Sequence, residues 1–281
     1  MSKRIAVVTD AVTDGFFFPL WHDYYAKYFG SENIFVVTYQ GPNTSFSSYI
    51  LGGLIRLPVL YSDSVRRGVI SNLVTTLLES YDTVIRVDTD EILVTDTSRF
   101  PPLDEFVRTF KGPYLAARGF DVVQLPHESP LGDDRTGILA RRTVAYPNTA
   151  LNKTCIVQTP INWTSGFHWC SVYPDFGPLF MLHLKRVDIN WQVDWYARIS
   201  ESTVDADLAE YYRADVQKIV DYHRGLSNRP ILGGIENWYR DKHLSQYLQN
   251  ITYRPKEGTY VGSYGHESVL CEIPEIWKQL F

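Results

Sequence analysis

The chain has 281 residues, of which 44% are hydrophobic and 14% aromatic. A chain of this length can bury enough apolar surface for one large domain with an extension. Its 27 Lys and Arg against 32 Asp and Glu give a net charge of −5. Proteins that bind nucleic acids usually carry a basic excess, so this balance argues against a nucleic-acid partner.

The cysteines and the amino terminus bear on the cellular compartment. Cys155, Cys170 and Cys271 are odd in number and lack CxxC spacing, so they predict neither a disulfide framework nor a zinc site. The first residues read MSKRIAVV, and this apolar run is too short for a signal peptide or a membrane span. We therefore expect a cytoplasmic protein without a membrane span.

The first forty residues predict a β-α-β unit. Residues 5–9 read as a buried parallel strand, residues 17–29 as a helix that ends at Gly30, and residues 34–39 as a second strand. Thr9 and Asp10 end the first strand, where ligands of open α/β sheets gather. A cap or a surface charge is the alternative reading of these two residues.

A second α-β unit follows. Residues 44–62 are ambiguous, because Gly52-Gly53 and Pro58 interrupt them. Ser62 or Asp63 is a plausible N-cap for a helix over residues 64–80, with Arg66, Arg67 and Asn72 near or beside its apolar stripe. The helix leads into an apolar strand at residues 83–87, which joins the same sheet.

That strand ends in the acidic motif around which the chain is organised. Residues 81–96 read YDTVIRVDTDEILVTD. On an extended chain, Asp88 and Asp90 would point the same way, about 6 to 7 Å apart. This spacing suits one divalent cation that in turn holds a diphosphate, and a solvated turn is the alternative. By the same alternation Glu91 faces away, which predicts a supporting role.

The rest of the chain alternates between strands and irregular segments before it becomes helical. A short helix is expected at residues 101–110 and a strand at 114–123, followed by a loop at 124–143 that either closes over a ligand or is plain surface. Further strands are expected at residues 154–157 and 179–188. We expect a core over residues 1–200 and a helical extension over 201–281 that packs on it.

With this β-α-β start, the DTDEIL motif and a later strand reading LFMLHLKRVD, residues 4–190 resemble the GT-A glycosyltransferases, and glycosyltransferase family 2 in particular. The resemblance implies an α/β, Rossmann-like fold with a mixed central sheet that binds a nucleotide-sugar. It implies that Asp88 and Asp90 hold Mn²⁺ or Mg²⁺ on the diphosphate and that His183 completes the metal shell. Asp88 would also contact the nucleotide-sugar.

Further site residues follow from the same resemblance. Lys185 and Arg186 would neutralise the leaving diphosphate, Thr9 and Asp10 would meet the nucleobase and ribose, and Arg67 would reach the pyrophosphate. The chemistry asks for such residues independently of any family, because a cation and positive side chains stabilise charge that develops on the leaving phosphates. For His183, a satisfied core histidine is the alternative.

A catalytic base is less clearly marked. An inverting transfer needs a base within reach of the acceptor hydroxyl, but no Glu-Asp pair of the kind many inverting members use follows residue 100. Asp121, Asp134 and His168 are the candidates, and the likeness to family 2 favours inversion. Trp163, His168 and Trp169 flank a probable turn, and this aromatic pair with an imidazole could form a platform for an acceptor sugar, with hairpin core packing as the alternative.

These features predict a metal-dependent glycosyltransferase. It would move a sugar from a nucleotide-sugar, with UDP-sugars first among the donors, to a glycan or another hydroxyl acceptor, in polysaccharide or glycoconjugate synthesis. A nucleotidyltransferase is one alternative, although residues 10–15 lack the basic residues expected of its phosphate loop. A carbohydrate-binding module that holds Ca²⁺ is the other.

Overall fold

The computed structural model describes residues 3–12, 17–40, 46–201, 210, 215–235, 242–265 and 268–280. Its helices are α1 (Phe18–Phe29), α2 (Asp63–Leu77), α3 (Leu103–Thr109), α4 (Ile189–Glu201), α6 (Val216–Leu226) and α7 (Lys242–Gln249). Short 3-10 turns are η1 (Ser31–Asn33), η2 (Ile138–Ala140), η3 (Thr149–Leu151), η4 (Ser165–Phe167) and η6 (Glu275–Trp277). The strands are β1 (Ile5–Ala11), β2 (Ile34–Thr38), β3 (Gly53–Arg56), β4 (Thr83–Arg86), β5 (Glu91–Thr95), β6 (Tyr114–Val122), β7 (Val144–Pro147), β8 (Thr154–Val157), β9 (Phe176–His183), β10 (Ile231–Gly234), β11 (Thr252–Arg254), β12 (Thr259–Val261) and β13 (Leu270–Glu272).

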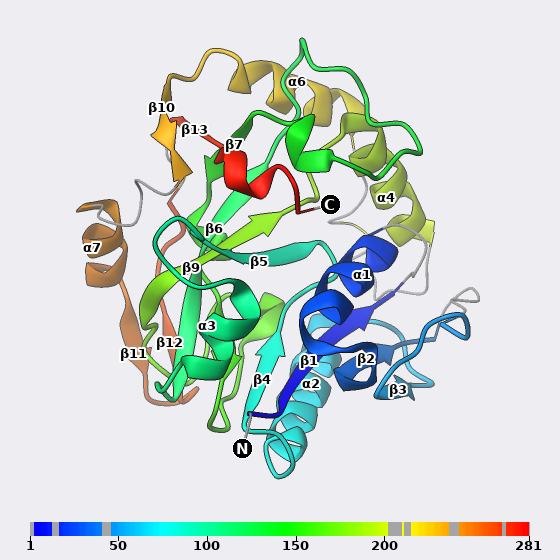
Figure 1. Ribbon diagram of the computed structural model, residues 1–281, viewed down its shortest axis with the longest axis vertical. Coiled ribbons are helices and arrows are strands. Elements are labelled where there is room, and N and C mark those ends of the chain that lie inside the picture. The colour runs from blue at the N-terminus through cyan, green and yellow to red at the C-terminus, as the bar shows by residue number, and fades with distance from the viewer. Residues whose placement is uncertain are drawn as a thin grey trace.

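Eleven of these strands form one mixed sheet (Figure 1). Its order is β10-β13-β7-β6-β8-β4-β1-β2-β3, and β9 joins β5 to β6. The pairings of β1 with β2 and with β4 are parallel, whereas β8 runs antiparallel to β4 and β6. The expected α/β class with a mixed central sheet is therefore confirmed.

Strand β1 separates two parts of the hydrophobic core. Its side chains alternate between the two faces of the sheet, so Val7 packs in the core part covered by α1 and α3, and Val8 in the part covered by α2. Helix α2 begins at the predicted cap Ser62, whose Oγ accepts from Val65 N at 3.3 Å. The two predicted α-β units are confirmed.

The acidic motif is a turn, so the expected alternation of its side chains is wrong. Strand β4 ends at Arg86 and β5 begins at Glu91, with a turn between them that is closed by a bond from Glu91 N to Asp88 O at 3.1 Å. Strand β5 then leaves β4 and pairs with β9 in antiparallel fashion, which sets Glu91 opposite His183. This pairing brings the late histidine to the motif.

We expected the segment beyond residue 201 to be helical, but it also contains strands. Besides α6 and α7 it contains β10 to β13, and β13 extends the main sheet by pairing with β7 and β10. Trp277 is buried in the main core and donates from Nε1 to Thr95 O at 2.8 Å. Short β-prone runs such as Val269-Leu270-Cys271 carry too little periodicity to be recognised without their sheet partners.

The loop over residues 124–143 is tied to the core by a buried arginine. Arg142 donates to Val187 O, to Ser129 O at 3.1 Å and to Asp188 Oδ2 at 3.3 Å. Its guanidinium thereby holds the loop against the segment that follows β9. That this loop closes over a ligand stays a prediction.

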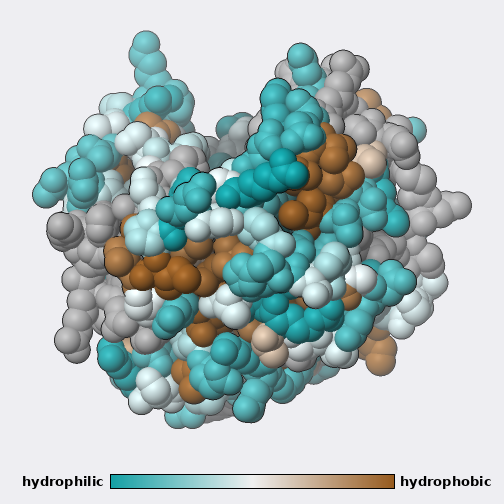
Figure 2. Space-filling model, turned by 90° about the horizontal axis from the view of Figure 1, so that it is seen from above, coloured by the Kyte–Doolittle hydropathy of each residue, from teal (hydrophilic) through white to brown (hydrophobic). Residues whose placement is uncertain are grey.

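The surface of the molecule is mixed in character. On the face seen in Figure 2, hydrophobic residues form separate patches among hydrophilic ones. Across the ranges that the structure describes, no helix has both the length and the apolar character needed to cross a membrane.

Candidate functional site

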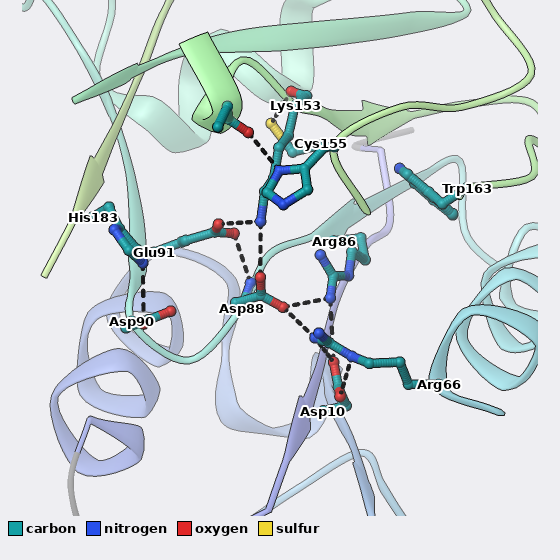
Figure 3. Close-up of polar contacts among 12 residues, drawn as sticks. Asp10, Arg66, Arg86, Asp88, Asp90, Glu91, Lys153, Cys155, Trp163 and His183 are labelled. Atoms are coloured by element: carbon teal, nitrogen blue, oxygen red, sulfur yellow. Dashed lines mark hydrogen bonds and ion pairs between the residues drawn. The ribbon is translucent and has the colours of Figure 1, made fainter. Parts of the chain in front are cut away.

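Two arginines and two aspartates meet at the carboxyl ends of β1 and β4 (Figure 3). Arg66 on α2 donates from Nε and Nη2 to the two carboxylate oxygens of Asp10, each at 2.9 Å, and from Nη2 to Asp88 Oδ1 at 2.7 Å. Arg86 reaches the same Asp88 oxygen at 2.5 Å and Asp10 Oδ1 at 3.2 Å. We call these four residues the arginine cluster.

Lys153 closes the other side of Asp88. Its Nζ lies 2.9 Å from Asp88 Oδ2 and 2.6 Å from Glu91 Oε1, and Asp88 N donates to Glu91 Oε2 at 2.8 Å. Burial alone would raise the pKa of Asp88, but Arg86, Lys153 and Arg66 hold it well below its usual range. Glu91 is fully buried, and burial together with the charge of Asp88 raises its pKa.

An aromatic ring supports both arginines. Phe167 lies beneath the Arg66 guanidinium at 4.6 Å and the Arg86 guanidinium at 3.3 Å from the ring centroid. Its φ of 59° places it in the left-handed region, which a bulky residue adopts only where its surroundings hold it there. The buried ring thereby helps to fix the direction of both charges, and Arg66 also lies over the Tyr61 ring at 5.2 Å.

A second set of charges centres on His183, which we call the histidine relay. His183 Nε2 lies 3.1 Å from Asp90 Oδ2, and Nδ1 lies 2.6 Å from Asp121 Oδ1. Asn148 Nδ2 donates to Asp121 Oδ2 at 2.9 Å, and Arg186 Nε lies 3.6 Å from that oxygen. Both ring nitrogens of His183 therefore face carboxylates.

The relay fixes the protonation of its members. Burial alone would lower the pKa of His183, but the Asp90 and Asp121 carboxylates raise it to about 10. Burial would raise the pKa of Asp121, yet Arg186 and His183 hold it far below its usual value. The three residues thus form an imidazolium between two carboxylates when no other cation is present.

The histidine relay fits a divalent cation at one position. A cation with ligand bonds of about 2.1 Å and octahedral geometry has adjacent ligands roughly 3 Å apart, which agrees with the 3.1 Å between Asp90 Oδ2 and His183 Nε2. Asp121 would accept from Nδ1 and orient the ring, as carboxylates do behind metal-bound histidines. Asp90 and His183 are therefore the two residues that could hold Mn²⁺ or Mg²⁺.

We expected Asp88 to bind the metal directly, but in the structure it pairs with cationic side chains. Its two oxygens accept from three cationic side chains, which leaves little negative charge to attract a further cation. Within the described ranges, no group of three or more His, Cys, Asp and Glu side chains forms a ready metal site. A cation at Asp90 and His183 would complete its shell with substrate oxygens and water.

Thr9, Asp10 and Arg67, the residues expected to contact the nucleotide, are not positioned to bind a ligand at this site. Thr9 has no exposed surface, and Asp10 is buried and accepts from Arg66, Arg86 and Tyr39. Asp10 therefore positions the arginines rather than presenting a free carboxylate. Arg67 is exposed on α2, since one residue along a helix turns the side chain by about 100°, and it is Arg66 that reaches the site.

None of the three expected bases has the environment of a base. Asp121 is buried, and its neighbours keep it ionised and weakly basic. Asp134 is exposed and accepts from Thr136 N and Oγ1 within its own loop. His168 Nδ1 donates to Ala150 O at 2.5 Å, and burial and Lys153 lower its pKa to about 3. With so low a pKa, His168 is a weak base near neutral pH.

Lys185 and Arg186 lie beside the histidine relay. Lys185 Nζ lies 4.6 Å from the ring centroid of Trp195 and 4.8 Å from that of Tyr196, and its charge helps to lower the pKa of Asp90. Arg186 lies over the Tyr222 ring at 4.1 Å. Lys185 thus acts on Asp90 and Arg186 on Asp121, and their role in neutralising a leaving diphosphate stays a prediction.

The sequence reasoning missed three cations of this site: Arg66, Arg86 and Lys153. Arg86 carried a signal, because a lone charge within the apolar run Val84 to Val87 must find a partner when the strand is buried. Lys153 directly precedes the buried strand β8, which is a weaker signal of the same kind.

The position of Lys153 depends on the close approach of Gly119 in β6 to Leu151 in η3, and this dependence can be tested. A Cβ on Gly119 of β6 would lie 2.0 Å from Leu151 Cβ and 2.6 Å from its carbonyl carbon. We therefore expect Gly119→Ala to displace η3 and to cost about 1–3 kcal/mol of stability, as overpacking does. Gly68→Ala on α2 is the control, because its Cβ would meet no atom within 4 Å, and it should stabilise by about 0.5–1 kcal/mol. Chemical denaturation of both variants measures the difference, and equal stability of the two would contradict the role of Gly119.

Comparison with known proteins assigns the chain to no family. The chain matches no protein-family model and has no significant match among the curated proteins with which it was compared.

Proposed function

We propose that this protein is a metal-dependent glycosyltransferase of the GT-A kind, which moves a sugar from a nucleotide-sugar, a UDP-sugar first, to a hydroxyl acceptor such as a glycan. One observation carries the proposal. The β5–β9 pairing sets His183 beside Asp90 and in front of Asp121, at the turn that follows the parallel strands β1 and β4. Ligands of α/β sheets bind at the carboxyl ends of such strands.

The charges around this point support a diphosphate as the ligand. Lys185 acts on Asp90 and Arg186 on Asp121, so both cations lie next to the histidine relay. Fixed cations of this kind stabilise negative charge that develops on a leaving group without having to reorganise. A divalent cation held by Asp90 and His183 would neutralise further charge on the phosphate oxygens.

The arginine cluster makes the site rigid rather than highly positive. Arg66, Arg86 and Lys153 are matched by the carboxylates of Asp10, Asp88 and Glu91. Because these charges cancel, the net attraction for a diphosphate falls mainly to Lys185, Arg186 and the cation at the relay. Inversion of the anomeric centre stays a prediction from the family resemblance.

The test is hydrolysis of the donor in the absence of acceptor. The protein is incubated with UDP-, GDP- and dTDP-sugars in Mn²⁺, in Mg²⁺ or in EDTA, and release of the nucleoside diphosphate is measured. We expect turnover with at least one donor, loss of turnover in EDTA and in Asp90→Asn, and unchanged turnover in Asp134→Asn, which alters an exposed carboxylate of the 124–143 loop. Absence of turnover and of metal-dependent nucleotide binding would refute the proposal, and release of pyrophosphate from a nucleoside triphosphate would favour a nucleotidyltransferase.

A further inference from the structure

Three aromatic rings stack next to the Lys153 side of the site. Trp169 lies nearly parallel to Tyr247 and to Tyr264, with ring centroids 5.8 and 5.7 Å away and planes inclined by 12° and 20°. Trp169 and Tyr247 are buried, whereas Tyr264 is 46% exposed. Tyr264 is therefore the one ring of these three that is open to solvent.

The position of Tyr264 is fixed by polar contacts. Its hydroxyl accepts from Trp169 Nε1 at 2.9 Å. The next residue, Gly265, donates from N to Thr149 Oγ1 at 2.6 Å, and its carbonyl accepts from that hydroxyl at 2.9 Å. A ring held in this way loses little conformational freedom when it contacts a ligand.

Thr149, which holds Gly265, also lies four residues before Lys153 of the proposed site. Thr149 begins η3, whose Ala150 carbonyl accepts from His168 Nδ1, and the chain then reaches Lys153. The His168 ring meets Tyr264 at 66° with centroids 5.3 Å apart. Because Nδ1 carries the proton that it donates, Nε2 has a lone pair that can accept a bond from a hydroxyl.

Gly166 makes room for this imidazole. A Cβ at that position would lie 2.8 Å from His168 Cδ2 and 3.0 Å from Nε2, and the φ of Gly166 is 70°. Both the space and the backbone conformation favour glycine. The edge of the ring that bears Nε2 and Cδ2 thus packs against the turn at Gly166, where a side chain would displace it.

The order of strands separates this aromatic surface from the side of the site that contains Asp10. Strand β4 lies between β1 on one side and β8 on the other. Asp10 and Arg66 belong to the β1 side, whereas Lys153 precedes β8. The acidic turn lies between them, so a sugar transferred from a donor at Asp90 could meet an acceptor on the β8 side.

We propose that Tyr264 and His168 form an acceptor subsite, in which a pyranose ring stacks on the open face of Tyr264 and one of its hydroxyls donates to His168 Nε2. A flat aromatic face beside a neutral acceptor nitrogen matches a ring that is apolar on its C–H face and bears hydroxyls at its edge. Of the expected platform, His168 is kept and Tyr264 takes the place of the two tryptophans, because Trp163 and Trp169 are buried and donate to Thr154 O and to the Tyr264 hydroxyl. The role as acceptor subsite rests on the proposed glycosyltransferase function, whereas sugar binding at Tyr264 does not.

The test is binding of simple sugars to the full-length protein. Saturation-transfer NMR and titration use the methyl pyranosides of glucose, galactose, mannose and N-acetylglucosamine. We expect at least one to bind and its affinity to fall about tenfold or more in Tyr264→Ala, which corresponds to the loss of one aromatic stacking contact. Tyr264→Phe keeps the ring and should bind within about threefold of wild type. Tyr253→Ala, which removes an exposed tyrosine of β11, should bind as wild type does.

The outcomes separate this inference from the proposed function. Unchanged sugar affinity in Tyr264→Ala, or no binding of any of the four sugars by the wild type, overturns the subsite even where donor hydrolysis is observed. Loss of UDP affinity in Tyr264→Ala with sugar affinity unchanged also overturns it, because the ring would then bind the nucleotide. Sugar binding that depends on Tyr264, with neither hydrolysis of any donor nor metal-dependent nucleotide binding, supports the sugar site and refutes the enzyme.

Discussion

Replacing His183 by alanine is expected to lower the affinity for UDP in the presence of Mn²⁺ by at least about 100-fold, while affinity measured in EDTA changes little. The reason is that Asp90 alone would remain to hold the cation, because the oxygens of Asp88 are taken by Arg66, Arg86 and Lys153. Loss of a metal-binding side chain exceeds the roughly 10- to 100-fold effect of residues behind it. Isothermal titration of UDP with Mn²⁺ or EDTA measures both affinities.

Asp121→Asn provides a graded comparison with His183→Ala. It keeps the size of the side chain but removes the charge that faces His183 Nδ1, so we expect the intermediate loss of roughly 10- to 100-fold that is typical of a residue behind a metal ligand. Circular dichroism checks that both variants are folded. Metal-dependent UDP binding that survives unchanged in His183→Ala would place the cation elsewhere.

Replacing Lys153 by methionine is expected to destabilise the protein by about 3–5 kcal/mol at pH 8, which is the usual effect of removing one partner from a buried ion pair. Lys153 and Glu91 are both buried, and their contact is 2.6 Å long. Without the lysine, Glu91 keeps a hydrogen bond from Asp88 N at 2.8 Å but has no ion pair left among the residues that the structure describes. Urea denaturation of the two proteins measures the loss.

The loss in Lys153→Met should depend on pH in a defined direction. Burial and Asp88 already raise the pKa of Glu91, and removal of Lys153 raises it further. The folded variant then binds a proton at Glu91 at pH values where the unfolded chain has released it, so its stability falls as pH rises above about 4.3. The deficit relative to wild type should therefore be smaller at pH 5 than at pH 8.

A double variant gives the matched control. In Lys153→Met with Glu91→Gln, no buried carboxylate is left without its cation at this position, so we expect most of the lost stability to return and its pH dependence to disappear. A double variant as unstable as Lys153→Met at both pH values would show that Lys153 acts through packing or through Asp88 rather than through Glu91.

The sequence by itself determined the local frame of the site. Buried runs of β-branched residues predicted β1, β2 and β4, and the spacing of apolar residues together with Ser62 predicted α2 and its start. These signals are local, since each depends on residues within a few positions of one another. For the same reason the sequence identified the acidic motif as the end of a buried strand, and it named Asp90 and His183 before their contact was known.

Only the tertiary structure decided which charges meet. Lys153 lies 65 residues from Asp88 and His183 lies 93 residues from Asp90, and no periodicity connects positions so far apart. The register of β5 on β9 selects His183, and one step around α2 selects Arg66 over Arg67. The turn after β4 also points Asp88 towards three cations. Such pairing is expected because an unpaired buried charge destabilises the folded state.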